Sequence, residues 1–245
     1  MSLAMSLPEL PRIYRQYSTL SRAARDRLAG SLAGKVLLSA GSDGLSATVA
    51  GTIAGAASLW VDADGETLRD GMRAGLCDFV VGTLDEALRI LKNEVRQKRP
   101  VSVGLQADPA ACVRRCIDRG FQPDVLLHSS SSIQREMETL TERGAVVLVE
   151  PPPLESDTSL LCWSVDGHAV KTMRAVGQIA AESLDSSRAD TPDRLRWIET
   201  APRDLGRTFA KMQCLEMDRH ESASFVTRVR SEYPAVRLSL EEAGT

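Results

Sequence analysis

The sequence predicts an α/β protein, in which a doubly wound parallel sheet is followed by a mainly helical C-terminal extension. Between Lys35 and Val149, short apolar runs alternate with amphipathic segments that begin at capping residues and end at glycines. Strands and helices that alternate over short loops are typical of a parallel sheet covered on both faces. Pro151-Pro152-Pro153 ends the alternation, because consecutive prolines stop a strand and stiffen the chain.

The stretch from Leu32 to Asp62 organises the sheet domain. An apolar run over 35–40 suits a buried strand, and the turn Gly41-Ser42-Asp43-Gly44-Leu45 lets backbone N–H groups approach a ligand. Small side chains over 45–57 predict a helix that packs tightly on the sheet, and the next strand ends at Asp62. A dinucleotide-binding half needs a phosphate site at the helix N-terminus and an acid at the ribose hydroxyls. We therefore expect the turn and Asp62 to bind a nucleotide, although the GxGxxG fingerprint is absent.

Capping residues and apolar periodicity predict the other elements. Thr83 and Glu86 form a capping-box pattern ahead of one helix, and Asp108-Pro109 begins another. We expect further helices over 8–28, 65–74, 84–98, 109–119 and 133–143, and further strands over 77–81, 101–105, 124–127, 145–149 and 159–165.

The C-terminal part has longer segments of helical period. We expect helices over 171–184 and 191–198, one or two more over 205–232, and fraying over 240–245. The expected organisation is a helical lead-in over 1–30, a dinucleotide-binding domain over 31–165 and a helical extension over 166–245.

Composition excludes several classes of function. Thirty Lys and Arg residues against 33 Asp and Glu give a formal net charge of −3, so nothing indicates a nucleic-acid partner. No apolar segment is long enough to span a bilayer, and no export leader is recognisable. The five cysteines are scattered and the three histidines form no ligand pattern, which favours reduced thiols over a metal site. We therefore expect a cytoplasmic protein with no metal and no membrane partner.

Several segments resemble one known family, in the same order along the chain. They are RLAGSLAGKVLLSAG (27–41), SLWVDAD (58–64), TLDEALRIL (83–91), SVGL (102–105) and RGFQPDVL (119–126). The run from about Gln16 to Ser132, roughly half of the chain, is similar to the NAD-binding domain of urocanase (urocanate hydratase). The resemblance implies a Rossmann-like fold with NAD as a candidate cofactor. In the family, bound NAD+ is the electrophile when water adds to urocanate, a hydro-lyase step of histidine degradation, and the catalytic enzymes are dimers.

The differences from the family fall on the loops that hold cofactor and substrate. Gly41 and Gly44 match family glycines, but Asp43 replaces another and the second glycine pair is missing. Asp62 stands where the family has a ribose-binding Glu, whereas Asp43 would place negative charge beside a pyrophosphate. The family's GNAA and DQTSAHDP segments align with residues 107–110 and 128–135. Its YGNNIR segment and catalytic cysteine region have no counterpart here, so the resemblance implies an inherited fold without urocanate hydration.

His128 and the serines that follow it are the second candidate site. They come directly after the fifth predicted strand, at the edge where doubly wound folds bind ligands. Ser129, Ser130 and Ser131 could lie near the nicotinamide end of a bound NAD, and His128 could act as an acid or base. The alternative is a solvated loop. At the first site, likewise, the glycines could serve only a tight turn, and Asp43 or Asp62 only a cap.

Three functions remain open. The leading hypothesis is a degenerate urocanase-like protein that binds a nucleotide or a related small ligand without hydrating urocanate. The second is a small hydro-lyase or NAD-dependent enzyme that uses His128, so that His128→Ala would abolish turnover. The third is a non-catalytic interaction module or homodimer, for which an apolar patch along Leu205–Val229 would be expected.

Overall fold

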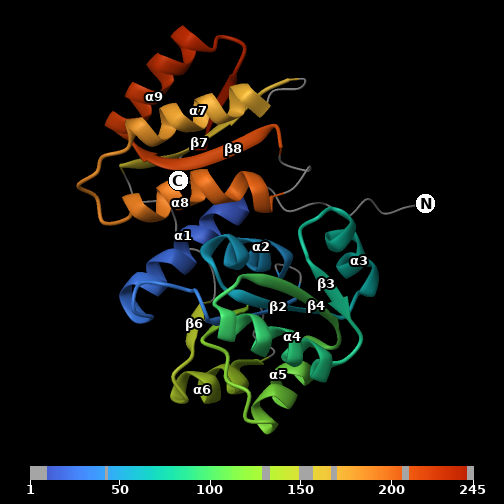
Figure 1. Cartoon of the computed structure of the whole chain (residues 1–245). Helices are drawn as coiled ribbons and strands as arrows, with labels where there is room; N and C mark the ends of the chain where they lie inside the picture. The colour runs from blue at the N-terminus through green and yellow to red at the C-terminus, as the bar shows by residue number, and fades with distance from the viewer. Residues whose placement is uncertain are drawn as a thin grey trace.

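The computed structural model describes residues 10–41, 44–128, 133–148, 157–166, 170–205 and 210–241. Figure 1 shows two sheets stacked through a shared layer of helices, with further helices on the outer face of each sheet. No helix in these described ranges is long and apolar enough to cross a membrane.

The larger sheet is parallel throughout and has the strand order β3-β4-β2-β1-β5-β6. Its strands are β1 (Val36–Ala40), β2 (Ala57–Asp62), β3 (Phe79–Val81), β4 (Val101–Gln106), β5 (Val125–His128) and β6 (Val146–Leu148). The central strands are buried along almost their whole length, which is why they appear in the sequence as continuous apolar runs. The predicted Rossmann-like parallel sheet is confirmed.

Helices cover both faces of this sheet (Figure 1). One face carries α4 (Leu84–Gln97), α5 (Pro109–Asp118) and α6 (Gln134–Glu142), and the other carries α1 (Leu10–Arg27), α2 (Gly44–Ala54) and α3 (Gly65–Arg73). The predicted caps of α4 and α5 are present, since Thr83 accepts the N–H of Glu86 and Asp108 that of Ala111.

The C-terminal part contains a second sheet, which was not predicted. It is antiparallel, has the order β8-β7-β9, and consists of β7 (Thr158–Ser164), β8 (Met212–Asp218) and β9 (Arg237–Glu241). The strand expected over 159–165 therefore exists, but it belongs to this sheet. Helices α7 (Val170–Ser183), α8 (Thr191–Asp204) and α9 (Arg219–Glu232) account for most of the remaining extension.

Within the stretch 205–232, the expectation of helix alone was wrong. Residues 212–218 form β8, whose backbone pairs with β7 and whose middle residues are buried. The end of the chain was also expected to fray from residue 240, yet Leu240 and Glu241 pair with β7. Strand propensity is weak in the sequence of β8, so burial between helices decides its conformation.

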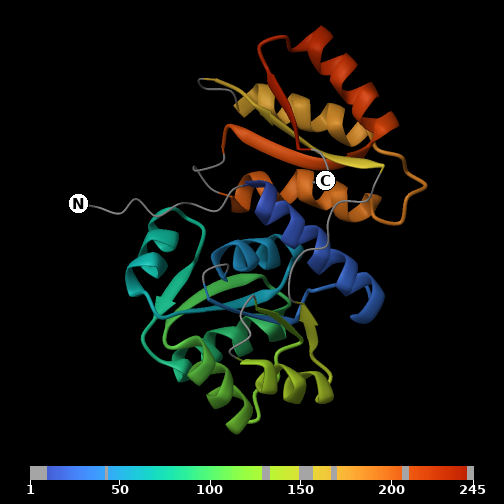
Figure 2. The same ribbon diagram turned by 180° about the vertical axis from the view of Figure 1, so that it is seen from behind.

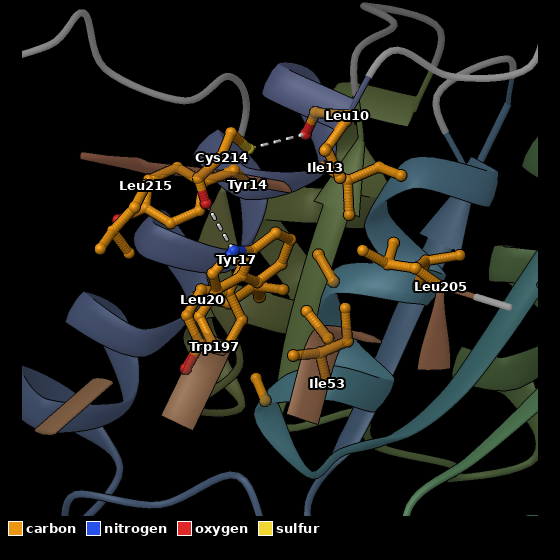
Figure 3. Packing of buried hydrophobic residues seen from close by; sticks show 14 of the residues in the cluster. Leu10, Ile13, Tyr14, Tyr17, Leu20, Ile53, Trp197, Leu205, Cys214 and Leu215 are labelled. Carbon is orange, nitrogen blue, oxygen red and sulfur yellow. Dashed lines mark hydrogen bonds between the residues drawn. The ribbon is translucent and has the colours of Figure 1, made fainter. Parts of the chain in front are cut away.

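Helix α8 joins the two halves of the molecule. The ring of Trp197 lies 5.0 Å from the rings of both Tyr14 and Tyr17, and its Nε1 donates to the carbonyl of Cys214 at 2.7 Å. Figure 3 shows these side chains converging with Leu10 and Ile53, so that α1, α2, α8 and β8 share one apolar core. The two sheets are therefore held together by a continuous hydrophobic cluster.

Candidate functional site

The candidate site lies at the carboxyl edge of the parallel sheet. β1 and β5 are neighbours, with Ala40 opposite His128, but the connections from β1 and from β5 run to opposite sides of the sheet. In open α/β sheets the loops diverge at such a point and leave a crevice for a ligand. The structure thus brings the backbones of the two predicted sites, Gly41 and His128, to the same edge.

The glycine turn after β1 is held by two backbone hydrogen bonds. Gly41 has a φ of 94°, which favours glycine, and its N–H donates to the carbonyl of Val61 in β2 at 3.1 Å. The N–H of Gly44 donates to the carbonyl of Gly41 at 2.9 Å and closes the turn. Helix α2 begins at Gly44, so its N-terminus lies at the carboxyl edge of the sheet. Ser42 and Asp43 lie outside the described residues.

Trp60 occupies the space directly beneath the start of α2. A Cβ atom on Gly44 would come well inside 3.0 Å of the indole ring, and a Cβ on Gly71 in α3 would come within 2.9 Å. The side chain is fully buried, and its Nε1 has no hydrogen-bond partner within the described part of the chain. A buried N–H donor therefore lies beside the first turn of α2.

Helix α2 is hydrogen-bonded to the sheet near its N-terminal end and to α8 at its C-terminal end. The hydroxyl of Ser39 in β1 contacts the hydroxyl of Thr48 at 2.9 Å and donates to the carbonyl of Gly44 at 3.2 Å. At the other end, Arg196 of α8 donates from Nε to the carbonyl of Ile53 at 3.2 Å, where a cation also favours the helix dipole. At its N-terminal end, α2 is thus held by Ser39 of β1 and packed against Trp60 of β2.

Asp62 ends β2 beside the glycine turn. One of its carboxylate oxygens accepts the N–H of Asp64 at 2.9 Å, and the other has no partner among the described residues. Asp64 in turn caps α3, and the hydrogen bond from the hydroxyl of Thr67, with that from the N–H of Glu66, lowers the pKa of its carboxyl. Asp62 therefore has one carboxylate oxygen without a partner among the described residues, whereas the Asp64 carboxylate caps α3.

Gln106 is a neighbour of Asp62 that the sequence analysis did not single out. It lies opposite Asp62 in the pairing of β2 with β4, and its side-chain amide covers Gly65 at the start of α3. Its signal in the sequence was only a polar residue at the end of an apolar run. Trp60 was missed for the opposite reason, because its polar atom is hidden in an apolar strand.

The second predicted site is only partly visible. His128 is the last residue of β5, but Ser129, Ser130 and Ser131 fall outside the described residues and nothing is described of the His128 side chain. The roles expected for these four residues stay predictions. In the part of the chain that is described, no group of three or more His, Cys, Asp or Glu residues could hold a metal ion.

Comparison with protein families gives a match that coincides with this architecture. The family model described as the urocanase Rossmann-like domain matches residues 14–138, just over half of the chain. The match runs from α1 through the five strands β1 to β5 and into α6, so it includes the glycine turn, Asp62 and His128. The chain therefore belongs to the urocanase family, of which it carries the Rossmann-like domain.

Proposed function

We propose that the protein binds NAD, or a closely related nucleotide, at the carboxyl edge of the parallel sheet and does not hydrate urocanate. One arrangement carries this proposal. The glycine turn sets the N-terminus of α2 at the carboxyl edge of the sheet, where β1 and β5 are neighbours, and a buried indole N–H without a described acceptor lies next to it. Helix N-termini at this edge of doubly wound sheets are the usual sites of pyrophosphate binding.

The described residues fit the phosphate part of a dinucleotide. The first N–H groups of a helix have no acceptor within the helix, and at α2 the N–H of Gly44 is used by the turn while those of Leu45 and Ser46 follow it. The helix dipole adds a partial positive charge. These N–H groups would hold the pyrophosphate, and Trp60 would keep the first turn of α2 in place from below.

The ribose part fits Asp62. A carboxylate at the end of the second strand accepts hydrogen bonds from both ribose hydroxyls and repels a 2′-phosphate. The second oxygen of Asp62, which has no partner among the described residues, supports this role, and the oxygen that accepts the Asp64 N–H keeps the carboxylate oriented. We therefore infer a preference for NAD over its phosphorylated form.

Any chemistry beyond binding would depend on His128, the last residue of β5. NAD supplies an electrophilic or hydride-accepting ring when it is bound. In the second candidate function, a small hydro-lyase or NAD-dependent enzyme, His128 would hold or move a proton beside that ring. This second function is supported by the pairing of His128 with Ala40, which places the backbone of His128 beside the end of β1. Loss of turnover in His128→Ala with unchanged nucleotide affinity would establish it.

An interaction module without a ligand has less support. Among the described residues of the stretch Leu205–Val229, Leu205, Phe225 and Val229 are buried in the core and so cannot contribute to the apolar patch expected there. Any self-association therefore needs another surface.

Substitution of Asp62 tests the binding proposal. We expect Asp62→Ala to weaken NAD+ binding by about 10- to 100-fold, since charged hydrogen bonds contribute about 1.5–3 kcal/mol. Asp62→Asn keeps an acceptor for the Asp64 N–H, so it should lose affinity without loss of thermal stability. The measurement is calorimetric titration with NAD+, NADH, ADP-ribose and AMP, with mass spectrometry for copurified nucleotide.

Asp70→Ala is the matched control, because Asp70 lies on α3 and pairs with Arg73 at the surface. Its affinity should equal that of the unmodified protein. An absence of binding up to millimolar nucleotide, with none copurified, would contradict the proposal. Equal affinity of Asp62→Ala and the unmodified protein would remove Asp62 from the site.

A further inference from the structure

Strand β9 forms an open edge of the second sheet. It pairs with β7 on one side, and no strand among the described residues pairs with its other side. Arg237, Ser239 and Leu240 are exposed, with Leu240 at 56%. The strand at the opposite edge, β8, is less exposed than β9, because all its residues between the two ends are buried. Unpaired backbone groups on an exposed edge are a template for pairing with another strand.

The sequence of β9, Arg237-Leu238-Ser239-Leu240-Glu241, is self-complementary when it is paired antiparallel about its middle residue. In that register Ser239 lies opposite its own copy, Arg237 lies opposite Glu241, and Leu238 lies opposite Leu240. The Arg237–Glu241 and Leu238–Leu240 pairs each occur twice, because the two strands are related by a two-fold axis, whereas the Ser239 pair lies on that axis and occurs once. Opposite charges and apolar side chains directly across from each other stabilise antiparallel strands.

Other symmetric registers lack this complementarity. A two-fold axis perpendicular to the sheet leaves corresponding faces of the two copies on the same side of the joined sheet. Such an axis must pass through a residue pair, so the alternative registers are those with the axis at a neighbouring residue. An axis at Leu238 places Arg237 opposite Ser239, and an axis at Leu240 places Ser239 opposite Glu241. Only the axis at Ser239 pairs both charges within the strand.

We propose that β9 docks onto β9 of a second copy of this chain, so that the two three-stranded sheets become one six-stranded antiparallel sheet. The pairing covers the exposed Leu240 with Leu238 of the second copy. Figure 2 shows β9 in red beside the yellow β7, in the half of the molecule away from the parallel sheet. The nucleotide site and the dimer contact are therefore on different sheets, and each can be tested without the other.

Charge reversal with compensation tests the register. Arg237→Glu and Glu241→Arg each place like charges opposite each other twice, so each should weaken dimerisation by about tenfold or more. The double variant Arg237→Glu/Glu241→Arg restores both opposite-charge pairs and should recover the dimer. Sedimentation velocity from about 1 μM to 1 mM protein covers the affinities expected for a small interface.

Two further variants test whether the contact between the two strands is itself responsible for the dimer. Arg237 also forms an exposed ion pair with Asp166 in the same chain, so Asp166→Asn should leave the dimer unchanged. Leu240→Lys places a charge opposite Leu238 of the second copy and should give a monomer with native circular dichroism. A monomer at every concentration of the unmodified protein would overturn the proposal. A dimer that is equally stable in both single charge reversals would overturn it as well.

Discussion

Replacing Arg194 by methionine is expected to lower the free energy of unfolding by about 3–5 kcal/mol, because it leaves a buried carboxylate without its cation. Nη1 of Arg194 lies 2.6 Å from a carboxylate oxygen of Glu221, and their side chains are only 3% and 1% exposed. Glu221 also accepts the N–H of Asp185 at 2.7 Å and that of Asp218 at 3.0 Å. The pair therefore ties the loop before α8 to the start of α9.

The measurement is urea unfolding followed by circular dichroism. Arg194→Met/Glu221→Met removes both charges and should be more stable than Arg194→Met, since no ion is left unpaired. Arg228→Ala is the matched control, because its ion pair with Glu182 at 2.9 Å is at the surface and should cost less than about 1 kcal/mol. Equal destabilisation by Arg194→Met and Arg228→Ala would show that the buried pair is not important.

Gly44→Ala should both destabilise the fold and abolish nucleotide binding. Its Cβ would overlap the indole of Trp60, so either the ring or the first turn of α2 must move. Overpacking of this kind costs about 1–3 kcal/mol. Because the N–H groups of that turn would hold the pyrophosphate, their displacement removes the binding geometry as well.

The smaller side chain of Trp60→Leu relieves the overlap. We expect Gly44→Ala/Trp60→Leu to lose less stability than the two single variants together, as measured by thermal unfolding with calorimetric titration of NAD+. Gly82→Ala is the control, because Gly82 has no atom within 4 Å of an added Cβ and does not have a positive φ. Additive losses in the double variant would show that Gly44 and Trp60 do not interact.

Local patterns predicted the parallel sheet because the residues that define its strands, turns and helices lie close together in the sequence. The apolar run of β1, the glycine turn and the small residues of α2 occupy consecutive positions. Thr83 and Asp108 cap helices through hydrogen bonds to N–H groups three residues away. The place of Asp62 was predicted for the same reason, since it is the last residue of its strand.

The second sheet could not be predicted in this way. β8 pairs with a strand about 55 residues before it, with Cys162 opposite Cys214, and its own residues have no strong preference for extended backbone. The hydrophobic cluster between α1, α8 and β8 supplies the burial that makes β8 a strand. Long-range burial of this kind leaves no periodic signal within the segment itself.

The sequence by itself determined the fold class, the family and the position of the glycine turn. Each of these depends on short segments in which the residues that matter are close together in the sequence. Only the tertiary structure decided that Trp60 lies beneath that turn, that Arg196 caps α2 from 143 residues away, and that Arg194 is buried with Glu221. Burying a polar group costs free energy unless it finds a hydrogen-bond partner, and Arg194 and Arg196 find such partners on distant segments. Such partners are chosen by the packing of the whole chain.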